Sequence, residues 1–275
     1  MLGAHELSLS QKARQLAPVR LTGNFGSEVL RSMSTFKRNG PGNELLDPSL
    51  AAQVDRTVVE QQARIVHPVT HAAFEEVPWH LFGTLAVARS ELTFRTPYLD
   101  NEVVELAYRA PPALRQAPTA AMRLIHRWAP GLAAIPTDRG LTSGPSTLRS
   151  RLHELACEVT FKLDYWHKEG LPDRLCRIDG VLDAFSHLGM LGLHKFLAYR
   201  IWFRQELAPY AADVIADTCG GGLPFWNAAA LKHIAEDHVK GRRNCLRDIH
   251  AVLTLTAIDR ILLDGRAYPA SMATA

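Results

Sequence analysis

The sequence predicts a mostly helical fold with one or few strands. Apolar residues recur at helical spacing along most of the 275 residues, and segment 18–23 is the one convincing candidate for a buried strand. Hydrophobic residues make up 47% of the chain and charged residues 21%, as in ordinary soluble globular proteins. A chain of this length can bury a substantial core, either as one large domain or as two small ones.

Local patterns justify the helices in the first and third quarters of the chain. Residues 5–16 are expected to form a short helix, and residues 50–64 contain neither proline nor glycine, so that a helix can run through them. Segment 181–207 is the most hydrophobic. Its glycines, Gly189 and Gly192, are expected either to break it into two helices or to allow close helix packing, and its aromatic residues are expected in the core.

A helix over 101–110 is predicted with both ends defined. Asp100 is a good N-cap, two prolines follow the helix, and Glu105 and Arg109 form a favourable pair four residues apart. The predicted apolar face consists of Val103, Leu106, Ala107 and Ala110.

Two further helices are predicted near the end of the chain. Asn227 is expected to cap the first, Gly241 to end it, and Asn244 to cap the second. The apolar face of the first consists of Leu231, Ile234, Ala235 and His238, and that of the second of Leu246, Ile249, Leu253, Ala257 and Ile261.

Charge, hydropathy and cysteine spacing argue against several classes of function. A net charge of +3, with arginines spread along the chain, does not favour nucleic acid as a partner. The sequence has no apolar run of membrane-spanning length, so no membrane partner is expected. The four cysteines have no C-x-x-C spacing, which favours reduced structural thiols in a cytoplasmic protein over a zinc site.

One ordered string resembles a known family signature. Arg95, Pro97, Tyr98, Leu99 and Asp100 stand in the places of the E-x-R-x-P-F-L-D run of the asparagine synthetase family's synthetase domain. Thr93 occupies the place of the family's glutamate. The resemblance assigns Arg95 and Asp100 to substrate contact or, more in keeping with their positions, to bracing the fold by pairing inside the domain.

A second match involves the segment TGNFGSE, which resembles the family's S-G-E-G-x-D-E loop beside the nucleotide. Gly23 and Glu28 keep their places, and the family's serine, two acidic residues and second glycine are replaced by Thr22, Asn24, Ser27 and Phe25. The resemblance implies that Glu28 is catalytic, by helping to hold the metal or the loop. It implies a cofactor-binding set of Thr22, Gly23, Asn24, Gly26 and Ser27. Asn24 has no ionisable group, so it cannot be a general base.

A third match lies at 135–141, IPTDRGL, in the place of the family's R-x-K-x-G-F loop. Aligning Gly140 with the family's glycine puts Asp138 at the lysine position and Arg139 beside it. The resemblance then makes Arg139 the catalytic cation that meets an anionic substrate. The alternative is a surface loop in which Asp138 and Arg139 pair with each other.

The resemblance extends over residues 5–264. Asp237, His238, Gly241 and Asn244 match the family's late D-H-x-x-G-x-x-N string. The family's S-G-G-x-D-S loop is absent, and residue 2 is Leu2 where the glutaminase domain has its cysteine. The resemblance therefore implies that 1–275 is a single partial domain. It would be the helical C-terminal lobe of an α/β adenine-nucleotide-binding, PP-loop ATPase-like synthetase domain.

The function implied by the resemblance is ATP-dependent amide formation, in which ATP activates a carboxylate and ammonia attacks it. ATP and Mg²⁺ are the implied cofactors. This chain is expected to be inactive by itself and to need a missing N-terminal synthetase or glutaminase part, either on a longer native chain or as a separate subunit. Homodimerisation, docking to a partner or poor solubility is also expected, because an incomplete sheet exposes its edge. The alternatives are a non-catalytic helical partner-binding remnant and an amidotransferase relative acting on another substrate in secondary or cell-surface biosynthesis.

Overall fold

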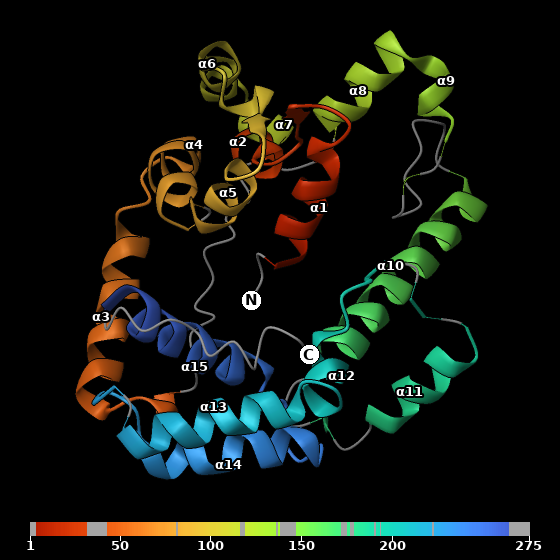
Figure 1. Ribbon diagram of the computed structural model, residues 1–275. Helices are drawn as coiled ribbons and strands as arrows, with labels where there is room; N and C mark the ends of the chain where they lie inside the picture. The colour runs from red at the N-terminus through yellow and green to blue at the C-terminus, as the bar shows by residue number, and fades with distance from the viewer. Residues whose placement is uncertain are drawn as a thin grey trace. The chain divides into compact units, whose positions relative to one another are not determined.

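The structure is a computed structural model, and it confirms the prediction of a mostly helical chain (Figure 1). It divides into two compact units: unit 1 comprises Met1–Arg38 and Asp55–Ala134, and unit 2 comprises Asn39–Val54 and Ile135–Ala275. The residues described are 4–31, 43–80, 82–115, 119–135, 137, 147–171, 175–176, 179–189, 191–192, 194–221 and 223–263.

Unit 1 combines a pair of strands with short helices. Its elements are α1 (Ala4–Arg14), β1 (Val19–Leu21), α2 (Gly26–Arg31), the second part of α3 (Pro48–Ala63), α4 (Pro68–Thr70), the π-helix η2 (His71–His80), α5 (Phe82–Arg89), β2 (Thr93–Arg95), the 3-10 helix η3 (Pro97–Leu99), α6 (Asn101–Arg109), α7 (Pro112–Arg115), α8 (Thr119–Trp128) and α9 (Pro130–Ala133). The predicted helices over 5–16 and 50–64 are thus confirmed as α1 and α3. The strand predicted over 18–23 is confirmed as β1, but the prediction that it is buried is wrong, because Val19 and Leu21 are exposed.

The two strands of unit 1 are parallel. Val19 is paired with Thr93 and Leu21 with Arg95, and the ladder continues through a hydrogen bond from Thr22 N to Arg95 O of 2.9 Å. Because the strands run in the same direction, the loops that follow them meet at one edge of the sheet. That edge brings together two segments that are distant in sequence.

The core of unit 1 lies beneath α2, α4, η2 and α6. Its buried apolar residues are Phe25, Val29, Val69, Val77 and Ala107. The capped helix is confirmed as α6, but its predicted apolar face is wrong at Leu106, which is 64% exposed, whereas Val104 packs against the core. The packing of α6 against α2 and α4 selects this face, and spacing alone does not distinguish the two.

Unit 2 is helical throughout its described residues, apart from an isolated bridge between Leu46 and Trp226. Its elements are the 3-10 helix η1 (Asn43–Leu45), the first part of α3, α10 (Leu148–Glu169), α11 (Asp179–His187), α12 (Tyr199–Arg204), α13 (Ala208–Gly221), α14 (Ala228–Val239), α15 (Leu246–Ile258) and the π-helix η5 (Asp259–Leu263). Helices α13 and α14 lie side by side (Figure 1), and both pack on α12 and α15 around the larger core.

The predicted ends of the last helices are confirmed except at one cap. Asn227 Oδ1 accepts hydrogen bonds from the first N–H groups of α14, and Gly241 follows that helix with φ +66°. The N-cap position of α15 is Cys245, one residue later than predicted, but Asn244 Oδ1 still accepts a hydrogen bond from the N–H of Leu246, the first residue of the helix, at 3.5 Å. Asn244 Nδ2 also donates to the carbonyl oxygen of Glu169 at 2.8 Å, so this side chain ties α15 to the end of α10.

The hydrophobic segment 181–207 is divided between two helices, α11 and α12. This is the first of the two alternatives predicted for its glycines, namely that they break the segment into two helices. Gly189 and Gly192 both have positive φ, +71° and +105°, which favours glycine. The expectation that its aromatic residues lie in the core holds for the buried Phe203 but is wrong for Phe196, which is 82% exposed. None of the helices in the described ranges has the length and apolar character that a membrane crossing requires.

Candidate functional site

Two of the family-like segments meet at the carboxyl edge of the parallel strands. The hydroxyl of Thr96, which follows β2, donates to the carbonyl oxygen of Asn24, which follows β1, at 2.8 Å. The N–H of Asn24 in turn donates to Thr22 Oγ1 at 3.2 Å. The loop after β1 is therefore held in shape by its own threonine and fastened to the loop after β2. We call residues 22–24 together with Thr96 the loop edge.

The two glycines of this region have different surroundings. A Cβ atom on Gly23 would meet no heavy atom within 4 Å, so this position faces open space. A Cβ atom on Gly26 would lie 2.8 Å from Cε2 of the Tyr98 ring. Gly26 therefore allows α2 to approach η3, and its packing role explains the glycine without a cofactor. Between them, Phe25 is buried with φ +72°, a backbone conformation in which glycine is more usual.

Glu28 lies inside unit 1, with 8% of its surface exposed. Burial raises the pKa of its carboxyl group, its own backbone N–H opposes that effect, and the nearby Glu76 raises the pKa further. Glu76 is itself buried, and its Oε2 lies 3.9 Å from Nε2 of His71. Because the Glu28 side chain is buried and not presented at the loop edge, its position favours bracing of the loop.

Most of the remaining predicted site residues lie at the protein surface, and one of them is the N-cap of α6. Asn24 and Ser27 are exposed at the loop edge and the start of α2, and Thr22 is half-buried. Asp100 caps α6 by accepting from the N–H of Glu102 at 2.9 Å, which is a structural role. Arg95 is exposed and forms no ion pair with another described residue, so the internal pairing expected for it is not observed there.

The third predicted segment cannot be placed at this edge. Asp138, Arg139 and Gly140 lie outside the described residues. Within the described ranges, no three histidine, cysteine, aspartate or glutamate side chains gather in a way that could hold a metal ion.

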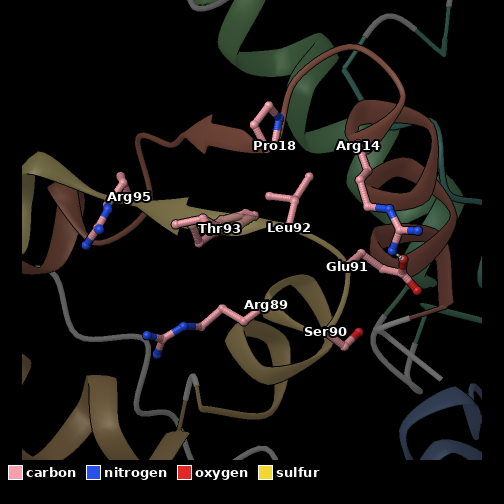
Figure 2. A pocket seen from close by; sticks show the side chains of 9 residues that line it. Arg14, Pro18, Arg89, Ser90, Glu91, Leu92, Thr93 and Arg95 are labelled. Carbon is pink, nitrogen blue, oxygen red and sulfur yellow. Dashed lines mark hydrogen bonds and ion pairs between the residues drawn. The ribbon is translucent and has the colours of Figure 1, made fainter.

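A pocket of about 490 Å³ lies beside the strands and extends along β2 from Leu92 to Arg95 (Figure 2). It is lined by Arg14, Pro18, Arg89, Ser90, Glu91, Leu92, Thr93, Phe94 and Arg95. The sequence did not predict this site, because its residues come from α1, from the residue before β1, and from the segment that runs from the last residue of α5 through β2. The only local sequence signal of the pocket is that the string RSELTFR begins and ends with an arginine.

No family model, no curated protein and no solved structure matches the chain.

Proposed function

We propose that unit 1 binds the anionic part of a nucleotide at its loop edge, as a segment of an ATP-dependent amide-forming ligase of the asparagine synthetase kind. The observation that carries the proposal is the hydrogen bond between Thr96 and the Asn24 carbonyl, which joins the two family-like loops. In sheets of parallel strands, ligands characteristically bind outside the carboxyl ends, where these loops lie.

The residues of the loop edge suit an anion better than a metal ion. Gly23 leaves open space at the edge, and the exposed amide of Asn24 and hydroxyl of Ser27 can donate hydrogen bonds. Mg²⁺ in nucleotide sites is held through one or two carboxylates and the phosphates. Because Asn24 and Ser27 are uncharged and the Glu28 side chain is buried, the described edge presents no carboxylate to Mg²⁺.

Bound ATP would activate a carboxylate for attack by ammonia, and that chemistry needs groups that the described residues of this chain do not provide. Asn24 cannot remove a proton, and Glu28 is covered. We therefore propose that residues 1–275 bind nucleotide without forming amides. The pyrophosphate-binding loop would come either from a longer native chain or from a separate synthetase or glutaminase subunit. All four cysteines are free, which suits a cytoplasmic location.

One observation favours the alternative of a partner-binding module. Val19 and Leu21 of β1 are 51% and 74% exposed, and an apolar strand of this kind is suited to pairing with another chain. A relative with another acceptor substrate would use the same loop edge, with its specificity set by residues outside it.

The test is thermal unfolding of the purified chain in increasing concentrations of ATP and Mg²⁺. Ligand binding to the folded state should raise Tm progressively, by about 2.7 kcal/mol of stability at a hundredfold excess over Kd. Gly23→Leu, which fills the open space, should abolish the rise and leave the ligand-free Tm nearly unchanged. Gly83→Leu on α5, where a Cβ atom also meets nothing within 4 Å, is the matched control.

The response of Tm to ATP distinguishes nucleotide binding from the partner-binding alternative. An unchanged Tm at all ATP concentrations would remove the nucleotide-binding proposal and leave the partner-binding module. Pyrophosphate release in the presence of ATP, aspartate and ammonia would show instead that the chain forms amides by itself.

A further inference from the structure

The pocket beside the two strands has an uneven distribution of charge. Figure 2 shows Arg14 and Glu91 facing each other at one end, whereas Arg89 and Arg95 extend toward the other. The ion pair joins Arg14 Nη1 to Glu91 Oε2 at 3.2 Å, and Gln11 Nε2 donates to the other carboxylate oxygen at the same distance. The single carboxylate of the pocket is therefore already engaged.

The positive charges of Arg89 and Arg95, by contrast, are not balanced by a carboxylate of any described residue. Both side chains are exposed, and neither forms an ion pair with any residue in the described ranges. Among the described residues that line the pocket, three arginines and one glutamate give a net charge of +2. Two guanidinium groups that line one concave site repel each other when the site is empty and attract an anion into it.

The geometry points to a second anion site, and we propose that this pocket binds a small phosphate ester whose phosphate lies between Arg89 and Arg95. Guanidinium groups bind phosphate oxygens through paired, charge-assisted hydrogen bonds. The volume of about 490 Å³ lies within the range of small-molecule sites and exceeds what a phosphate ion alone requires. Pro18, Leu92 and Phe94 supply an apolar wall for the organic part of the ester.

This site is distinct from the loop edge. The two sites share no residue but are neighbours: the pocket extends from Pro18 and Leu92, which precede the strands, to Arg95, the last residue of β2, which directly precedes Thr96 of the loop edge.

The probe is phenyl phosphate, titrated calorimetrically into the full chain, with inorganic phosphate and benzoate as comparisons. We expect phenyl phosphate to bind more tightly than either, because only it offers both a dianion and an apolar body. Arg89→Gln and Arg95→Gln should each weaken binding about tenfold. Arg109→Gln, which removes an exposed arginine paired with Glu105 on α6, should change binding less than twofold.

Two further variants make the proposal falsifiable independently of folding. Glu91→Gln removes the one negative charge of the pocket and should tighten phenyl phosphate binding severalfold, a gain that damage to the fold cannot imitate. Gly23→Leu should leave phenyl phosphate binding unchanged. Equal affinities in the wild type and both arginine variants, no detectable binding to the wild type, or loss of binding in Gly23→Leu would each overturn the proposal. Benzoate binding as tightly as phenyl phosphate would reassign the site to carboxylates and overturn the phosphate ester.

Discussion

The ring of Tyr98 occupies the space that a side chain on Gly26 would need, with Cε2 2.8 Å and Cζ 3.0 Å from the position of a Cβ atom. Gly26 begins α2 and Tyr98 lies in η3, so the pair joins the helix after β1 to the turn after β2. Both residues belong to the family-like segments, and their contact is part of the small core of unit 1. The glycine is thus explained by packing against the ring.

Gly26→Ala is expected to destabilise the protein by about 1–3 kcal/mol, because the added methyl group must displace a well-packed ring or the backbone of α2. The measurement is the free energy of unfolding from urea titration. Gly23→Ala, where the methyl group enters open space, is the control and should change stability by less than about 0.5 kcal/mol. Equal losses in the two variants would show that backbone freedom, and not the Tyr98 contact, governs both positions.

Asp100→Ala is expected to cost about 1 kcal/mol, because the first N–H groups of α6 lose the acceptor that now binds Glu102 N. Asp100→Asn keeps a side-chain oxygen at the cap and should restore most of that stability. Urea midpoints at constant m-value provide the comparison. If the asparagine variant is as unstable as the alanine variant, the interaction of the charge with the helix dipole, not the hydrogen bond, is responsible.

The buried histidine of α14 is expected to make stability depend on pH. Burial is the main cause that lowers the pKa of His238 to about 4, and the positive charge of Arg204 adds to it. The unfolded chain therefore binds a proton near pH 6.5 that the folded chain does not accept until about pH 4. Stability is full above pH 6.5, falls by about 3 kcal/mol as the pH drops to 4, and stays level below that.

His238→Leu isolates this effect, because the difference in unfolding free energy between the variant and the wild type should change with pH over that interval. Burial also lowers the pKa values of His167 and His250, but both residues remain in the variant and their contributions cancel. His126→Leu, which changes an exposed histidine of α8, is the control. A difference that stays constant from pH 7 to pH 4 would contradict the prediction.

The features that the sequence predicted well are local. The Asp100 and Asn227 caps and the Glu105–Arg109 pair depend on residues within one or two helical turns, and all three occur in the structure. The division of 181–207 followed from its glycines for the same reason. Such features can be predicted without knowing which elements pack against each other.

The features that were missed depend on distant partners. Leu106 faces solvent because α2 and α4 contact a different side of α6, and the bond from Asn244 to Glu169 at the end of α10 could not be foreseen from local sequence. β2 is a strand only because β1 lies beside it. The arginine pocket has no sequence signature, since its lining residues converge from separate segments. For the same reason, the pairing of the two family-like loops could be established only from the structure.

The hydrogen bond between Thr96 and Asn24 joins residues 72 positions apart in sequence, and this separation bears on how unit 1 folds. During synthesis, β1 leaves the ribosome long before β2 exists, and residues 39–54 in between belong to the other unit. Closing so long a loop costs entropy before any strand contact compensates for it, so pairing should be a late and slow step. Until then, the exposed Val19 and Leu21 lie on an unpaired strand, and nascent chains are most vulnerable to aggregation or chaperone capture during that interval.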